Sequence, residues 1–194
     1  MSHFLEKFCI TSFTNIQIFV TNIHYINGDY MYYVNTFFLF SILGHFIEDF
    51  FYVTKDSGIF FGWWTPIYGI GVCIVIYLYK LVNKIFKLNK ISKPIIVFLI
   101  GFIILSFMEL ISGILIQKLF RVTFWDYSNE PFSIFRYTSL KMSFIWGISS
   151  LLIIYIIKPI LDKFITKIPR LVSYVLITLF TIDSFLTFSP YLVK

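Results

Sequence analysis

Five long apolar runs, separated by shorter polar stretches, dominate the pattern of this chain. A membrane-spanning helix needs roughly 20 mostly apolar residues, and each run approaches that length. The predicted crossings are about Tyr33–Val53, Trp64–Val82, Pro94–Leu115, Met142–Ile157 and Leu171–Phe188. Pro94 suits a helix start, where its missing N–H matters little, while Lys158-Pro159 and Pro190 predict where the last two helices end. The pattern therefore predicts an all-α, polytopic membrane helix bundle.

The residues before Tyr33 do not fit this pattern. Polar side chains such as Thr14, Asn15 and Gln17 interrupt their apolar positions, and they lack the compact apolar core and small-residue cleavage site of a signal peptide. We expect residues 1–32 to form an interfacial or mobile segment, with a sixth crossing as the alternative. Residues 33–194 are expected to form a single transmembrane domain.

Composition and charge exclude a soluble domain and do not support nucleic-acid binding. Hydrophobic residues make up 58% of the chain and charged residues 13%, against about 45–50% and 25% in soluble domains. The net charge of +6 comes from Lys and Arg beside the apolar runs, which is the pattern that sets membrane orientation. Ten of the 16 basic residues fall on the side that holds the N-terminus. We therefore expect a multi-pass protein of the cell membrane with a cytoplasmic N-terminus.

No cofactor or metal site is predicted. Cys9 and Cys73 are far apart, so neither a disulfide nor a paired metal ligand can be argued from them. The sequence contains no Walker, HExxH or GxSxG motif. If the chain takes part in ATP-driven transport, a separate polypeptide must supply the ATPase.

Two segments outside the apolar runs have unusual composition, and the predicted orientation places both on the outer face. The first, Gly58–Gly71, combines glycines with Trp64, Pro66 and Tyr68 at the entry to a membrane helix. Irregular backbone at membrane depth is tolerated only where protein or a watery cavity surrounds it. In the second, Trp125, Asp126 and Tyr127 begin a turn that ends at Pro131-Phe132. Its aromatic residues suit a folded lid over a pocket or, alternatively, ordinary contacts with the membrane interface.

Four carboxylates lie within or beside the apolar runs: Glu48, Asp49, Glu109 and Asp183. A charge at the bilayer centre costs about 2.5–3.5 kcal/mol, so such a residue normally has a partner or a role. His45 lies one helical turn before Glu48, and this pair could bind a cation or relay a proton. The alternative is that these groups only make polar contacts near the interface. We take His45, Glu48, Glu109 and Asp183 as candidate substrate- or ion-binding residues.

A series of lysines follows the second apolar run at intervals of three or four residues. The series consists of Lys80, Lys84, Lys87, Lys90 and Lys93. This spacing predicts a stripe on one helical face that could dock an acidic partner or anionic lipid. The simpler interpretation is the positive charge typical of cytoplasmic loops.

Several of these motifs together resemble one protein family. Gly44–Glu48, Pro66-Ile67-Tyr68-Gly69, Glu109, Trp125-Asp126-Tyr127-Ser128 with Pro131-Phe132, Ser143, Trp146-Gly147 and Asp183 stand in the order and approximate spacing of the CmpB-like family of ABC-transporter type IV membrane proteins. The resemblance implies a polytopic bacterial membrane protein and, within a transporter, the role of a permease-type subunit. The chain departs from the family pattern at His45, Ser133 and Arg136, where the family usually has an aromatic residue, asparagine and glycine.

Three functions are compatible with these features. The first is a transport component, in which Glu48, Glu109 and Asp183 line a polar cavity closed by the two outward segments and a cytoplasmic ATPase docks on the lysines. The second is an intramembrane enzyme that acts on a lipid-linked substrate through His45, Glu48 and Glu109. The third is a non-catalytic accessory or immunity protein that binds a partner in the membrane. Homo- or hetero-oligomers are compatible with each of them.

Overall fold

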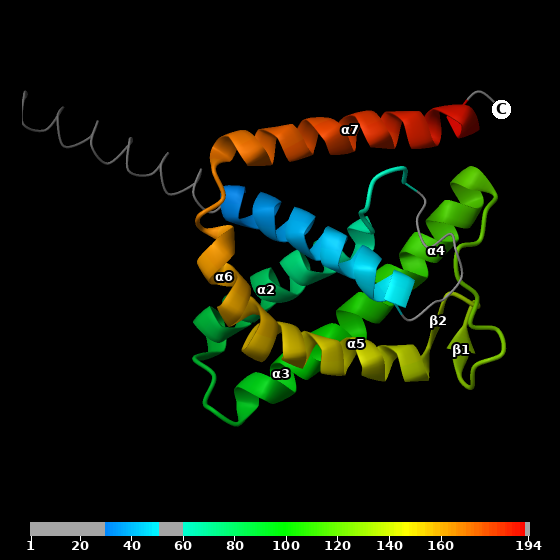
Figure 1. Cartoon of the computed structure of the whole chain (residues 1–194). Coiled ribbons are helices and arrows are strands. Elements are labelled where there is room, and N and C mark those ends of the chain that lie inside the picture. The colour runs from blue at the N-terminus through cyan, green and yellow to red at the C-terminus, as the bar shows by residue number, and fades with distance from the viewer. Residues whose placement is uncertain (1–29, 51–59, 193–194) are drawn as a thin grey trace, which may run out of the picture.

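The computed structural model of this protein describes residues 30–50 and 60–192, which form an antiparallel arrangement of long helices (Figure 1). A helix over residues 30–50 comes first, followed by α2 (Pro66–Phe86). Next come α3 (Ser92–Ile100), the π-helical turn η1 (Gly101–Leu105) and α4 (Ser106–Phe120), which run on without a break. A small hairpin of β1 (Ser133–Ile134) and β2 (Thr138–Ser139) leads into α5 (Leu140–Leu152), η2 (Ile153–Ile157) and α6 (Lys158–Ile165). The last helix is α7 (Arg170–Leu192).

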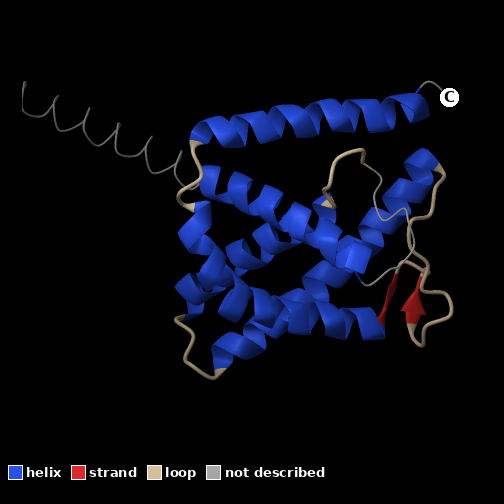
Figure 2. Ribbon diagram, in the orientation of Figure 1, coloured by secondary structure: helices blue, strands red, loops and turns tan. Residues whose placement is uncertain are grey.

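The fold is that of a membrane protein. Four helical spans, Pro66–Phe86, Ser92–Leu119, Leu140–Ile165 and Arg170–Ser189, are long and apolar enough to cross a bilayer. The predicted all-α membrane bundle is therefore confirmed. The β1–β2 hairpin, which is the one sheet in the described part of the chain, lies at one end of the bundle (Figure 2).

Proline does not end the last two helices as predicted. The fourth apolar run continues through Lys158-Pro159 to Ile165, and α7 continues to Leu192. Proline lacks an N–H and crowds the preceding turn of an α-helix, but η2, directly before Lys158, widens the helix at this point. A bend accompanies the change, since α6 turns away from the axis of α5 toward the start of α7 (Figure 1).

Small residues allow the helices to approach one another closely. A Cβ atom on Gly69 of α2 would lie 2.3 Å from the carbonyl oxygen of Phe37 and 2.3 Å from Oγ of Ser41. In η1, a Cβ on Gly101 would lie 2.6 Å from the carbonyl oxygen of Trp146 in α5. Contacts of this kind, rather than a hydrophobic driving force, hold membrane helices together.

The predicted lysine stripe is wrong, because the five lysines do not share a helix. α2 ends at Phe86, Lys87 adopts a left-handed conformation with φ 44°, and Asn89 accepts hydrogen bonds from the N–H groups of Ile91 and Ser92 at the start of α3. Lys80 and Lys84 thus lie on α2, Lys87 and Lys90 in the connection, and Lys93 on α3. The Nζ atom of Lys80 lies 5.0 Å and 5.3 Å from the ring centroids of Tyr32 and Tyr33, within cation–π range.

Candidate functional site

Glu109 is the most buried carboxylate of the four predicted candidates, with 3% of its surface exposed. It lies on α4 and accepts a hydrogen bond at Oε1 from the hydroxyl of Tyr127, over 3.1 Å. The side chains of Thr138 and Trp146 also approach its carboxylate. Their hydrogen-bonding atoms and Glu109 Oε2 are nevertheless buried without a hydrogen bond of ordinary geometry. Three neutral polar groups from the loop, β2 and α5 therefore converge on one acid.

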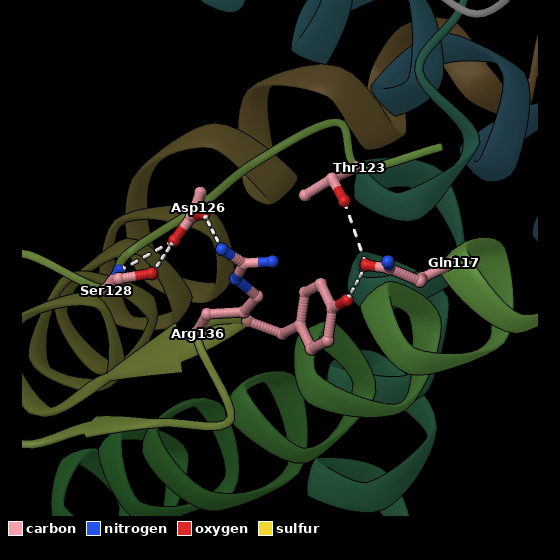
Figure 3. Close-up of polar contacts among 6 residues, drawn as sticks. Gln117, Thr123, Asp126, Ser128 and Arg136 are labelled. Atoms are coloured by element: carbon pink, nitrogen blue, oxygen red, sulfur yellow. Dashed lines mark hydrogen bonds and ion pairs between the residues drawn. The ribbon is translucent and has the colours of Figure 1, made fainter. Parts of the chain in front are cut away.

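The segment that carries Tyr127, residues 123–137, folds back on itself over this acid, and we call it the cover. The indole N–H of Trp125 donates to the carbonyl oxygen of Tyr137 over 2.9 Å, and the N–H of Tyr127 donates to that of Arg136 over 2.8 Å. A salt bridge of 2.8 Å joins Arg136 to Asp126 (Figure 3). Hydrogen bonds from Ser128, more than the charge of Arg136, hold the pKa of Asp126 below its ordinary value. Asp126 therefore acts as a structural acceptor within the cover.

Arg136 occupies a backbone conformation that suits glycine. Its φ is 63°, and Phe132 and Phe135 are also left-handed, at 56° and 49°. This is the position at which the sequence departs from the glycine of the family pattern. Contacts to the partners of Arg136, including the Asp126 carboxylate, compensate for the strained backbone.

A second set of polar contacts joins the cover to the end of α4. Gln117 Oε1 accepts hydrogen bonds from the hydroxyl of Thr123, over 2.9 Å, and from that of Tyr137 (Figure 3). The ring of Tyr137 packs where Gly113 of α4 has no side chain. The cover is thus fastened to the same helix that carries Glu109.

Glu48 and His45 make separate contacts rather than a pair with each other. Oε2 of Glu48 accepts a hydrogen bond from the Thr65 hydroxyl over 3.3 Å, and the side chain of Tyr68 also bonds to this carboxylate. Nε2 of His45 lies 3.4 Å from Asp49 Oδ2. Nδ1 of His45 is buried without a hydrogen-bond partner among the described residues. The described part of this segment, residues 60–71, is therefore attached to the first helix through Thr65 and Tyr68.

Two aromatic rings connect the surroundings of Glu48 with those of Glu109. The ring of Tyr68 lies 5.7 Å from the ring of Trp146, centroid to centroid. Tyr68 also fills the space beside Gly44, where a Cβ would lie 2.4 Å from the ring. Pro66 occupies the first turn of α2 and directs Tyr68 inward. The two acids thus belong to one continuous set of contacts that runs through Tyr68 and Trp146.

Asp183 holds the loop before α2 against α7. Its carboxylate accepts hydrogen bonds from the backbone N–H groups of Phe61 and Gly62, over 3.0 Å and 2.7 Å, and from the indole N–H of Trp64, over 2.8 Å. The hydroxyl of Thr187 donates a fourth bond over 3.0 Å. Both carboxylate oxygens are engaged, and none of these partners is shared with Glu109.

Sequence reasoning missed several polar residues of the bundle. Thr138 and Trp146 were not taken as site residues, although Trp146-Gly147 belongs to the motifs that carried the family resemblance. Asp162 was also missed: it accepts a hydrogen bond from the Tyr32 hydroxyl over 2.9 Å and pairs with Lys158. In the sequence, a single acid after Lys158-Pro159 looks like an ordinary surface charge. Only its contact with Tyr32 of the first helix shows that it joins two helices.

One cavity of about 330 Å³ lies between the first helix and α7, away from these acids. Aromatic and aliphatic side chains line it: Tyr30, Tyr33, Val34, Phe37, Phe38, Ile177 and Phe180. Within residues 30–50 and 60–192, no group of three or more His, Cys, Asp or Glu side chains is placed to hold a metal ion.

Comparison with known proteins identifies a family for most of the chain. The sequence model of a family described as "Putative ABC-transporter type IV" matches residues 35–188. This range includes Glu48, Glu109, Asp183 and both outward segments. No curated protein and no solved structure matches the chain.

Proposed function

Because this chain belongs to the CmpB-like family of ABC-transporter type IV membrane proteins, we propose that it is the permease-type membrane component of a transporter. We place it in the cell membrane with its N-terminus in the cytoplasm, which the distribution of Lys and Arg supports. The sequence contains no nucleotide-binding motif. We therefore assign ATP hydrolysis to a separate cytoplasmic subunit.

The observation that carries the proposal is the set of polar groups around Glu109. Burying a carboxylate that is 3% exposed on a membrane-length helix costs free energy. Such a residue is therefore normally retained for a partner or a role. Unpaired polar atoms of Glu109, Thr138 and Trp146 meet at this point, and the Tyr127 cover lies at its outer end. In our proposal, the polar solute passes Glu109 when the cover opens. It then moves along Tyr68 toward Glu48.

Replacement of Glu109 by glutamine is expected to lower transport at least about tenfold, equivalent to ~1.4 kcal/mol, because the ionisable carboxyl group is lost while the shape is kept. Cells that express the chain with its ATPase would be tested for uptake of a radiolabelled panel of ions, sugars, amino acids and lipid precursors. The initial rate for the accumulated solute is then compared between wild type, Glu109→Gln and Glu48→Gln.

Glu130→Gln provides the matched control for this comparison. Glu130 lies in the same cover and pairs at the surface with Lys141, over 2.7 Å, so its loss should leave uptake within about twofold of wild type, as expected for a surface ion pair. Equal uptake by Glu109→Gln and wild type would contradict a transport role for Glu109.

Neutralising the lysines around the α2–α3 connection is expected to weaken binding of the ATPase subunit. Lys84, Lys87 and Lys90 are exposed, while Lys80 is engaged by Tyr32 and Tyr33. The triple Lys→Gln variant should therefore reduce copurifying ATPase activity several-fold and make the remainder more sensitive to salt. Lys141→Gln, at the start of α5 and far from this connection, is the control. Loss of ATPase from Lys141→Gln but not from the triple variant would argue against docking at the α2–α3 connection.

A non-catalytic accessory protein is the second candidate, and the contacts of Asp183 favour it. Three of its four hydrogen bonds come from the loop before α2 and one from Thr187 of α7 itself, as expected for an acid that fastens a loop to a helix. Unchanged solute uptake in the Glu48 and Glu109 variants, together with loss of folding in the Asp183 variants, would support this alternative.

A further inference from the structure

We infer that Glu109 is a proton-binding site: in the closed structure it is a neutral carboxylic acid, and Thr138 is the group that accommodates both the acid and the carboxylate. The inference deepens the proposed function, since it names a proton as a ligand of the same group. Its evidence is the geometry around Glu109 and is independent of any solute.

The first step concerns the ion pairs of the described residues. None of the ion pairs found among residues 30–50 and 60–192 includes it. A buried carboxylate with no cation and little water is unfavourable, and such a group becomes neutral by binding a proton.

The surrounding elements contribute neutral groups. Tyr127 is the titratable side chain in contact with Glu109. Arg136 of the cover is paired with Asp126, and Lys141 at the start of α5 is paired with Glu130. On α5, the polar groups that face α4 are uncharged, since Ser143 bonds to Ser106 over 2.8 Å and Trp146 approaches the acid itself. Beyond Trp146 and Tyr68 lies the next acid, Glu48, with His45 one turn before it and Asp49 directly after it on the same helix.

The second step is a count of donors and acceptors. The indole N–H of Trp146 can only donate to Glu109, whereas the hydroxyls of Tyr127 and Thr138 can each donate or accept. Tyr127 donates to Oε1 in the structure, which leaves Thr138 to change roles at Oε2. In the neutral acid, Oε1 accepts from Tyr127, Oε2 carries the proton and donates it to Thr138 Oγ1, and Oε2 accepts from Trp146. The three buried polar atoms of this cluster that now lack a partner, Glu109 Oε2, Thr138 Oγ1 and Trp146 Nε1, are then satisfied.

Loss of the proton requires only one rearrangement. The Oε2–H bond breaks, the proton leaves to water, and the Thr138 hydroxyl rotates so that it donates to Oε2 rather than accepts from it. The carboxylate then accepts three hydrogen bonds, within the capacity of its two oxygens. The same three side chains thus serve both protonation states, which is what reversible proton binding requires.

Infrared spectroscopy of the full chain in lipid tests this assignment. At neutral pH we expect a C=O stretching band of a protonated carboxyl that is lost in Glu109→Gln and retained in Glu48→Gln and Glu130→Gln. Glutamate labelled with ¹³C at the side-chain carboxyl should shift this band in the wild-type protein, so the assignment does not depend on a variant that folds. A wild-type spectrum without any glutamate-derived acid band would overturn the inference.

Variants of Thr138 test the donor and acceptor count. Thr138→Val should move the acid band to higher frequency, because the O–H group loses its acceptor, and Thr138→Ser should restore it. A band unchanged by Thr138→Val would overturn the role of Thr138. If the acid band is absent while Glu109→Gln still abolishes solute uptake, the proton site fails and the proposed transport function survives. If the band is present and Glu109→Gln leaves uptake unchanged, the proton site survives and the proposed transport role of Glu109 fails.

Discussion

Replacing Gly69 by alanine is expected to lower the free energy of unfolding by about 3 kcal/mol, at the upper end of the usual cost of overpacking. The new Cβ would lie 2.3 Å from the carbonyl oxygen of Phe37. Because this oxygen belongs to the backbone of a helix, it cannot rotate away, and the whole first helix must move off α2. The change should be measured as a lower midpoint of thermal unfolding in detergent, followed by size-exclusion chromatography.

Gly71→Ala, on the same helix, separates this effect from the ordinary consequences of losing a glycine. A Cβ there would lie 3.1 Å from Cδ2 of Leu105, which is the end of a flexible side chain. Alanine also favours the helical conformation by about 1 kcal/mol relative to glycine, so the net change should be close to zero. Equal destabilisation by both variants would show that the Gly69 contact is not the cause.

Replacing Asp183 by asparagine is expected to release the outward loop from α7. An amide can no longer accept at both positions, so at least one of the Phe61, Gly62 and Trp64 donors is left buried without a partner. Hydrogen bonds to charged groups contribute about 1.5–3 kcal/mol each, and we expect a loss of about 3–5 kcal/mol in total. Thermal unfolding should report the loss, and a red-shifted emission of Trp64 should report exposure of the loop.

Thr187→Val is the matched control for Asp183. It removes a single donor of the same cluster, at 3.0 Å, and should cost only about 0.5–1.5 kcal/mol. Protection of the Phe61 and Gly62 amides from hydrogen exchange should fall in Asp183→Asn and persist in Thr187→Val. Persistent protection in both variants would contradict the anchoring role of Asp183.

The hydrophobic pattern predicted the helices well but not where they end. Length and apolarity are local properties, so the five runs identified the five helices that the structure describes. The ends depend on how a neighbouring turn adapts. η2 widens before Pro159 and lets the fourth helix continue, and no sequence rule based on proline alone foresees this.

The candidate site was predicted in part. Glu109 and Tyr127 were taken as candidates because an acid in an apolar run and an aromatic turn are visible in the sequence, and the structure brings these two together. Thr138 and Trp146 carry no such signal, because their importance arises only where α5 and the hairpin meet α4. The partners of Asp183 were also invisible, since two of them are backbone N–H groups.

The π-helical turn η1 gives the inward face of the third helix its register. The buried positions are Val97 and Ile100 before this turn, Gly101 and Leu105 within it, and Ser106, Glu109 and Gly113 after it. A π-turn holds one residue more than an α-turn, and each residue rotates an α-helix by about 100°. The extra residue in η1 therefore helps to set the direction in which Glu109, several residues later, faces α5. Insertions and deletions within η1, and not only substitutions of the acid, can thus turn this family's buried carboxylate toward protein or toward lipid.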